Sequence, residues 1–344
     1  MAELVCLIFS NGNTWKVMRR FTLSTLRDFG MGKRTIEDRI LEECKNLVKS
    51  FKAHKGEPFE KTTIIFAAVA NIIVSIVMGH RFEYNDPKLH RLMSIVTENI
   101  KIIGSPMVFL YNAFPSLVRW LPGSHRKVIP HKEELHTFIR ETFTNQKEQL
   151  DVNDQRTFTD VFLMKQKEEK PNPEIYFSDE NLTSLITDLF AAGMDTTSAT
   201  LRWAPLLMMK YPEIQNKERF EKPDEFYPQH FLDTEGNFVK NEAFLPFSAD
   251  KEHFEKPDEF YPQHFLDTEG NFVKNEAFLP FSAGKRGCAG ETLAKMELFL
   301  FFTTLLQNFT FQAPPGAKLD ITGAVGFTTP PLKHEICAIP RKVK

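Results

Sequence analysis

The chain has 344 residues and a formal net charge of −2. So balanced a charge gives no electrostatic case for nucleic acid as a partner, because proteins that bind it are usually markedly basic. Hydrophobic residues make up 42% of the sequence, and the 33 Phe outnumber the 6 Tyr and 3 Trp. This composition favours an enzyme-sized chain with an apolar interior that can receive apolar ligands.

The four cysteines, Cys6, Cys44, Cys288 and Cys337, lie far apart along the chain. Without a paired spacing they indicate neither a disulfide framework nor a zinc site, and we expect a reducing, cytosol-facing environment. The first ten residues include Glu3 and hold too short an apolar run for a signal peptide or a membrane span. They predict a soluble chain.

Helix-spaced apolar positions and strong helix formers predict a mainly helical protein. Besides a helix around Trp15, the predicted helices span residues 35–51, 62–78, 88–103, 131–150, 179–209 and 291–309. Pro205 is expected to kink the helix at 179–209 or to end it early. Residues 165–175 predict an exposed loop, and residues 336–339 predict a strand of a small hairpin whose turn lies at 326–331.

In the first predicted helix, Trp15 and Arg19 stand four residues apart and therefore share one face. An indole N–H and a guanidinium on one face can bind the same carboxylate. The spacing alone also fits a core Trp beside a solvated Arg, which is the commoner arrangement.

The helix predicted at 179–209 interrupts its apolar stripe with the residues Ala192-Gly193-Met194-Asp195-Thr196-Thr197. Two explanations are open. Threonine hydroxyls can bond to the preceding turn of their own helix while Asp195 faces water. Alternatively, the polar groups serve chemistry in an otherwise apolar site.

Residues Phe281-Ser-Ala-Gly-Lys-Arg-Gly-Cys288-Ala-Gly290 place one cysteine in a glycine-rich, basic loop just before the last predicted helix. The glycines let backbone N–H groups approach the sulfur closely. Arg286 and the positive end of the helix dipole favour the thiolate, so we expect a lowered pKa for Cys288. An isolated cysteine is more often an ordinary buried residue. The whole loop instead favours a thiolate ligand for haem iron.

The loop resembles that of the cytochromes P-450, the haem-thiolate monooxygenases, which has the form Phe-x-x-Gly-x-Arg-x-Cys-x-Gly. Phe281, Gly284, Arg286, Cys288 and Gly290 fill its five fixed positions. The closest likeness is to the microsomal family 2. The resemblance implies a mainly α fold of the cytochrome P-450 type over residues 1–344, as a single incomplete domain with small β-hairpins near the C-terminus.

The resemblance also implies the cofactor, haem b (iron protoporphyrin IX), with Cys288 as the metal ligand. In the family, the pair matched by Trp15 and Arg19 holds a haem propionate, and Arg286 is expected to hold one too. The implied haem contacts are Trp15, Arg19, Ala192, Phe281, Arg286, Cys288 and Gly290.

The segment at 192–197 resembles the family's distal-helix motif. There, a glycine at the position of Gly193 opens a groove for dioxygen, and the pair matched by Asp195 and Thr196 delivers protons to it. These two residues are the implied catalytic groups. The implied substrate contacts are Phe190, Ala191, Ala192 and Phe327.

The implied reaction is oxidation of a small apolar substrate, such as a xenobiotic, a fatty acid or a steroid, by O2. Electrons come from an NADPH–cytochrome reductase, with cytochrome b5 as a second donor. Microsomal relatives lie on the cytoplasmic face of the endoplasmic reticulum membrane, so a membrane surface is an implied partner. Because no anchor-like segment is found, a soluble cytoplasmic form is the alternative.

The chain departs from the family pattern in two places. Residues 220–249 recur identically as 254–283, and we expect this duplicated insert to pack poorly. A Glu-x-x-Arg motif, which braces the ligand loop in the family, is absent from the sequence. A non-catalytic, truncated relative with weak or no haem binding is therefore the second hypothesis. A thiol enzyme or zinc protein built on Cys288 is a third, disfavoured because no His lies near it in sequence.

Overall fold

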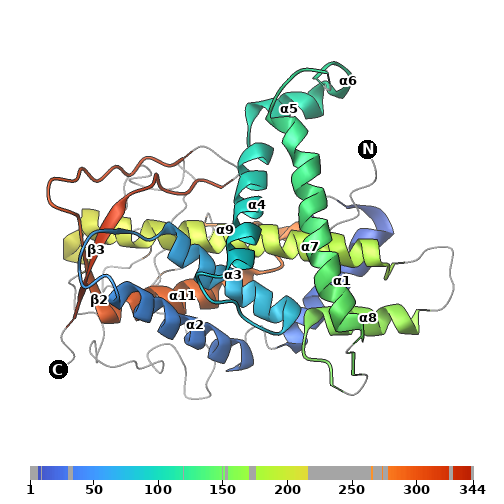
Figure 1. Ribbon diagram of the computed structural model, residues 1–344, viewed down its shortest axis with the longest axis horizontal. Coiled ribbons are helices and arrows are strands. Elements are labelled where there is room, and N and C mark those ends of the chain that lie inside the picture. Colours follow the sequence, from blue (N-terminus) through green and yellow to red (C-terminus); the bar gives the residue numbers. More distant parts are fainter. Residues whose placement is uncertain are drawn as a thin grey trace.

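The computed structural model describes residues 7–8, 10–29, 34–118, 120–148, 150–151, 154–169, 176–215, 265, 273, 278–324 and 328–341. Within these ranges the protein is mainly helical, as predicted (Figure 1). The insert at 220–249 and Phe327 lie outside the described residues, so the expectations placed on them stay predictions.

The longer helices are α1 (Gly12–Asp28), α2 (Arg34–Lys52), α3 (Thr62–Met78), α4 (Pro87–Ile103), α7 (Val128–Glu148), α8 (Phe158–Glu168), α9 (Asp179–Lys210) and α11 (Glu291–Asn308). The shorter ones are α5 (Pro106–Ala113), α6 (Pro115–Val118), α10 (Pro212–Gln215) and the 3-10 turns η1 (Ser124–Lys127) and η5 (Gly284–Arg286). The strands are β1 (Phe59–Glu60), β2 (Phe309–Gln312) and β3 (Glu335–Pro340). Each predicted helix is confirmed to within about one turn at either end.

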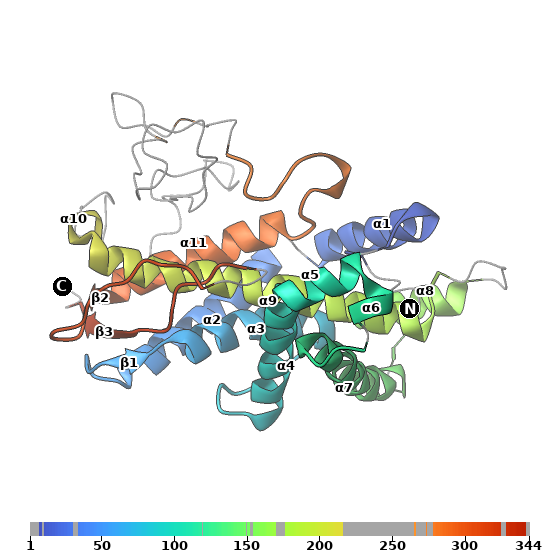
Figure 2. The same cartoon turned by 90° about the horizontal axis from the view of Figure 1, so that it is seen from above.

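The long helix α9 runs through the middle of the molecule, and α3, α7 and α11 pack against it (Figures 1 and 2). It begins at Ser178, whose hydroxyl accepts a hydrogen bond from the backbone N–H of Asn181 at 3.2 Å. The prediction that Pro205 could end the helix early is wrong, since α9 continues to Lys210. Pro205 is buried in the helix interior, where packing offsets the lost backbone hydrogen bond.

Helix α3 is almost entirely apolar and buried, and it lies directly on α9. At the contact point α9 has Gly193. A Cβ built on this glycine would lie 2.6 Å from Cδ1 of Ile73, which is closer than real Cβ contacts come. The missing side chain therefore allows the two helices to approach each other.

The first helix is held to the body by aromatic side chains. The ring of Phe21 makes edge-to-face contacts with Phe158, Phe162 and Phe177 at centroid distances of 5.4, 5.4 and 5.2 Å. Two of these rings belong to α8, which was not predicted and which replaces the first part of the loop expected at 165–175. Helix α8 starts with a capping box formed by Thr157 and Asp160.

The predicted strand near the C-terminus is confirmed as β3, but its partners differ from those expected. β3 is the middle strand of a three-stranded antiparallel sheet in the order β1-β3-β2. Phe59 of β1 is paired with Ile336, and Phe311 of β2 is paired with Ala338. A single bridge between Gly323 and Pro331 is the described pairing across the expected hairpin turn. The sheet thus ties the segment before α3 to the end of α11.

An apolar arm, formed by residues 103–121 with α5 and α6, stands out from the helical body (Figure 1, top). In the described part of the chain, no single helix is long and apolar enough to cross a membrane. The bent pair α4 and α5, at 59° to each other, reaches the required length and composition only when both helices are counted.

Candidate functional site

The loop that carries Cys288 is a compact turn closed by backbone hydrogen bonds. The N–H of Cys288 donates to the carbonyl of Phe281 at 2.9 Å, and the N–H of Gly287 donates to that of Gly284 at 3.1 Å. Gly284 has a φ of +75°, a left-handed conformation that favours glycine. The turn holds Cys288 two residues before Gly290, the N-cap of α11.

The predicted lowering of the pKa of Cys288 is wrong for the protein in this structure. The side chain of Cys288 is exposed, but neighbouring protein atoms partly desolvate its sulfur and raise the pKa of the thiol. The charge of Glu291 raises this pKa further. The backbone N–H of Gly290 and the charge of Arg19 act in the opposite direction. The expected cation does not reach the sulfur, because Arg286 turns toward α1.

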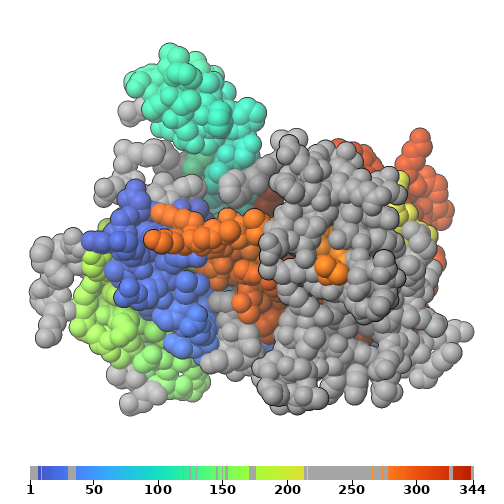
Figure 3. Space-filling model, turned by 180° about the vertical axis from the view of Figure 1, so that it is seen from behind, coloured from blue at the N-terminus to red at the C-terminus, as the bar shows by residue number. Residues whose placement is uncertain are grey.

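Three side chains from α1 and the loop, Trp15, Arg19 and Arg286, meet in what we call the α1–loop clamp. Arg19 donates from Nη2 to the carbonyl of Gly287 at 2.6 Å, directly beside the cysteine. The guanidinium of Arg286 lies 4.1 Å from the ring centroid of Trp15, and it donates to the carbonyl of Ser10 at 2.8 Å. Figure 3 shows the loop, in orange, lying against α1, in blue.

The α1–loop clamp has an unfilled hydrogen-bonding requirement. Nε1 of Trp15 is buried and has no hydrogen-bond partner among the described residues. A buried indole N–H costs free energy unless it finds an acceptor. With Arg19 and Arg286 next to it, the acceptor that fits is a carboxylate, because its two oxygens can accept from several donors. The residues present therefore fit a haem propionate.

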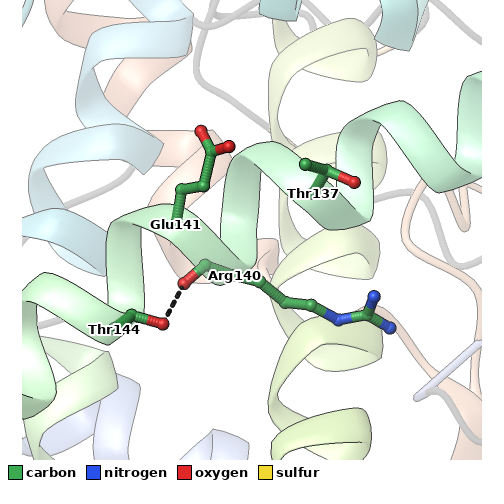
Figure 4. A pocket seen from close by; sticks show the side chains of 4 residues that line it. All are labelled: Thr137, Arg140, Glu141 and Thr144. Carbon is green, nitrogen blue, oxygen red and sulfur yellow. Dashed lines mark hydrogen bonds between the residues drawn. The ribbon is translucent and has the colours of Figure 1, made fainter.

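A hollow of about 180 Å³ reaches Cys288 between α1 and the start of α11. It is lined by Leu23, Arg27, Cys288, Ala289, Glu291 and Thr292. A larger, open hollow of about 570 Å³ runs along α7 (Figure 4) and is lined by Thr137, Arg140, Glu141 and Thr144. None of the predicted site residues lines the larger hollow, so its size does not make it the candidate site.

On α9, the predicted oxygen-activating residues divide between two sides of the helix. Ala192 and Thr196 are exposed on one face, and the hydroxyl of Thr196 donates to the carbonyl of Ala192 at 2.7 Å. Asp195 is buried, and its carboxylate accepts a hydrogen bond from the hydroxyl of Thr328. The two implied catalytic groups are not hydrogen-bonded to each other within the described residues, and Thr196 makes the back-bond that was the alternative explanation.

The packing also places two other α9 residues of the expected site. Phe190 is fully buried in the hydrophobic core, on a different side of the helix from Ala192 and Thr196, so it does not share their exposed face. Gly193 faces Ile73 of α3 and opens no groove. Ala191 is half-buried.

The comparisons with known proteins support the family resemblance of the Cys288 loop. The family model Cytochrome P-450 matches residues 6–221, 215–249 and 248–338. The chain belongs to the cytochrome P-450 family. Members of this family bind haem b, and the chain is a haem-dependent monooxygenase of the type that acts on xenobiotics or steroids.

The individual relatives show that the chain is similar to members of family 2. It is 41% identical over 412 residues to mouse cytochrome P-450 2C29, covering 97% of this chain and 77% of the relative. Zebrafish cytochrome P-450 2K6 is 40% identical over 422 residues, covering 97% and 75%. Both alignments are longer than the 344-residue chain. Each relative therefore has residues inside the aligned region that this chain lacks.

The sequence reading missed Glu297, a buried carboxyl in the interior of α11. The side chain of Thr197, the neighbour of Thr196 on α9, acts on this carboxyl group and lowers its pKa, and Oε1 of Glu297 is buried without a hydrogen-bond partner among the described residues. Burial raises the pKa of Glu297 to about 8. The residue links the helix behind the cysteine to the polar segment of α9, and one acid inside an apolar helix was the available signal.

Glu297 keeps its proton in the folded protein up to a pH of about 8, whereas the unfolded chain loses it near the ordinary value of 4.5. Stability therefore falls as pH rises through this window, by on the order of 3 kcal/mol at pH 7 for a fully buried group. We expect Glu297→Gln, which cannot ionise, to raise the thermal midpoint more at about pH 8 than at about pH 5. Calorimetry at both pH values measures this difference.

The matched control is Glu141→Gln, an exposed carboxyl on α7. It should leave the pH dependence of the midpoint unchanged. An equal midpoint change at both pH values in Glu297→Gln would contradict the prediction.

Proposed function

We propose that Cys288 is the thiolate ligand of the haem and that the chain oxidises small apolar molecules, among them xenobiotics, fatty acids or steroids, with O2. The observation that carries this proposal is the α1–loop clamp. Its buried indole N–H lacks an acceptor, and two guanidinium groups lie beside it, next to the ligand loop. Electron supply by an NADPH–cytochrome reductase, with cytochrome b5 as a second donor, belongs to the proposal through family membership.

In this proposal each residue of the loop has a defined task. Gly290 donates its backbone N–H to the sulfur, and Phe281 accepts from the N–H of Cys288. Arg19 fixes the carbonyl of Gly287 and so sets the direction of the next residue, Cys288. When bound, the haem supplies the reductive activation of O2. The protein positions the thiolate, and its apolar interior excludes water.

The exposed face of α9 supplies the distal side in this proposal. Ala191 and Ala192 contact the haem or substrate, and the hydroxyl of Thr196 moves protons after leaving the carbonyl that it now bonds. Asp195 acts as its acidic partner, which requires release from Thr328. Phe327 stays a predicted substrate contact.

The second candidate is a non-catalytic relative with weak or no haem binding. The raised pKa of Cys288 favours it, because the ligand must be deprotonated before it binds iron. The α1–loop clamp favours the first candidate, since Arg19 and Arg286 tie the loop to α1 and so replace part of the missing Glu-x-x-Arg brace. One domain that spans residues 1–344 is part of the same proposal.

The reduced, CO-bound absorption spectrum of the full chain reconstituted with haem separates these candidates. We expect a thiolate-shifted Soret band in the wild type and its loss in Cys288→Ser, because a hydroxyl does not replace the thiolate. Cys337→Ser, which changes a buried cysteine of β3, is the control and should keep the band. A wild-type spectrum without the shift would establish the non-catalytic relative.

The α1–loop clamp is tested by Trp15→Phe, which keeps an aromatic ring beneath Arg286 but removes the indole N–H. Losing one hydrogen bond to a carboxylate should weaken haem binding about tenfold. Titration with haem, followed at the Soret band, gives the dissociation constant. Trp203→Phe is the matched control, because Nε1 of Trp203 already donates to the carbonyl of Thr329 at 2.9 Å. Equal haem affinity in both variants would remove the propionate role from Trp15.

We propose that the apolar arm rests on a membrane surface. Its exposed large side chains include Phe109 at 79% and Trp120 at 75% exposure. So much exposed apolar surface in one place is uncommon on a protein without a partner. Arg126 and Lys127 in η1 adjoin the arm, as basic residues do where a protein meets anionic lipid headgroups. The cytoplasmic face of the endoplasmic reticulum is the membrane that family membership favours.

Vesicle sedimentation measures this association. The triple variant Phe109→Ser, Leu117→Ser and Trp120→Ser removes three exposed apolar groups, each contributing roughly 1 kcal/mol or more to insertion. We expect vesicle binding to fall at least about tenfold. Leu332→Ser, at 42% exposure in the chain before β3, is the control and should bind like the wild type. Equal binding by the triple variant would show that the arm does not meet the lipid.

A further inference from the structure

Three basic side chains from distant segments meet at the N-terminus of α3. Lys61, its N-cap residue, is only 1% exposed, and its Nζ lies 2.5 Å from Nε2 of His334. Arg202 of α9 is 9% exposed, and its charge acts on both Lys61 and His334. Arg202 donates from Nη2 to the carbonyl of Pro331 at 3.2 Å, and its buried Nε has no partner among the described residues.

The carboxylates near these basic groups are engaged elsewhere. Glu60 accepts a hydrogen bond from the backbone N–H of Thr62 at 2.8 Å, and Asp195 accepts from Thr328. Both act on Arg202 only through longer-range attraction. Within the described ranges, neither carboxylate forms an ion pair with Lys61 or Arg202. Lys61 and Arg202 thus have no ion-pair partner in the part of the chain that the structure describes.

The surroundings make these buried charges costly. Burial lowers the pKa of Lys61 to about 7, with Glu60 opposing the shift and Arg202 adding to it. Burial likewise lowers the pKa of Arg202 and of His334. The N-terminus of α3 adds the positive end of a helix dipole. Buried charges of one sign are normally compensated by a counter-ion or a hydrogen-bonded partner.

We infer that Lys61 and Arg202 form a subsite for a small oxyanion, namely a phosphate or carboxylate group. His334 lies beside this subsite, with Nδ1 bonded to the carbonyl of Leu332 at 2.8 Å and Nε2 facing Lys61. The unpaired Nε of Arg202 and the ammonium group of Lys61 are the donors that such a group binds best. His334, next to Lys61, is only half-buried. The subsite uses no residue of the α1–loop clamp and does not depend on the proposed function.

The anion should bind more weakly as pH rises through about 7, because Lys61 then loses its charge. Glu60 and Arg202 act electrostatically on both Lys61 and His334. Lys61 also acts on His334. Asp195 acts on Arg202 from α9. Of these groups, Lys61 is the one whose titration lies near neutral pH, because burial lowers its pKa to about 7.

The test is thermal unfolding of the full chain at constant ionic strength, in a buffer whose main anion is a bulky organic sulfonate. Sodium phosphate and sodium formate are titrated separately, so that the two arms distinguish phosphate from carboxylate. We expect at least one of them to raise the wild-type midpoint by a saturable few degrees, and more at acidic than at alkaline pH. No saturable rise with either anion would overturn the inference.

Lys61→Met separates anion binding from a structural role. Because it removes a buried uncompensated charge, it should raise the midpoint without added anion and abolish the response to phosphate or formate. A lower midpoint, or an unchanged response, would show that Lys61 serves packing alone. Lys333→Met, the same substitution at the exposed neighbour of His334, is the control and should keep the full response. His334→Gln, at a half-buried position, should weaken the response and provides a second variant if Lys61→Met does not fold.

Discussion

The hydrogen bond from Arg19 to the carbonyl of Gly287 is the contact on which the candidate site depends. It joins residues 268 positions apart and connects α1 directly to the loop that holds Cys288. Helix α1 can hold the loop in position because it is itself fixed to the body, where Phe21 packs among three other aromatic rings. The geometry of the sulfur is therefore set by an N-terminal helix as well as by its own loop. This matters more in a chain whose sequence lacks the Glu-x-x-Arg motif.

The helices behind the site are held by close packing and by a buried acid. Gly193 lets α3 approach α9, while Glu297 connects α11 to α9 through Thr197. The first contact is apolar and favourable at any pH, whereas at the second, burial keeps the carboxyl group of Glu297 protonated and Thr197 favours its ionised form. The polar segment of α9 thus lies between one rigid neighbour and one that responds to pH.

Much of the fold could be predicted from the sequence, because helix periodicity and capping residues are local signals. The loop around Cys288 and the pair Trp15 and Arg19 could be found for the same reason, since each motif is short. The pKa of Cys288 could not, because it depends mainly on how far the fold desolvates the sulfur, and the cation brought near it is Arg19 rather than Arg286. The hydrogen-bond partner of Asp195 is Thr328, 133 residues away along the chain, so no local sequence signal predicts it.

The position of β3 between β1 and β2 has a consequence for the order of folding during synthesis. β1 comes before α3, yet its strand partner leaves the ribosome only after α11 and β2 have been made. Until then the edges of β1 and β2 are unpaired, and Phe59 and Phe309, both buried in the final structure, lack that cover. The nascent chain therefore carries β1 without its strand partner through most of its translation, and the sheet can close only when the last strand has been made.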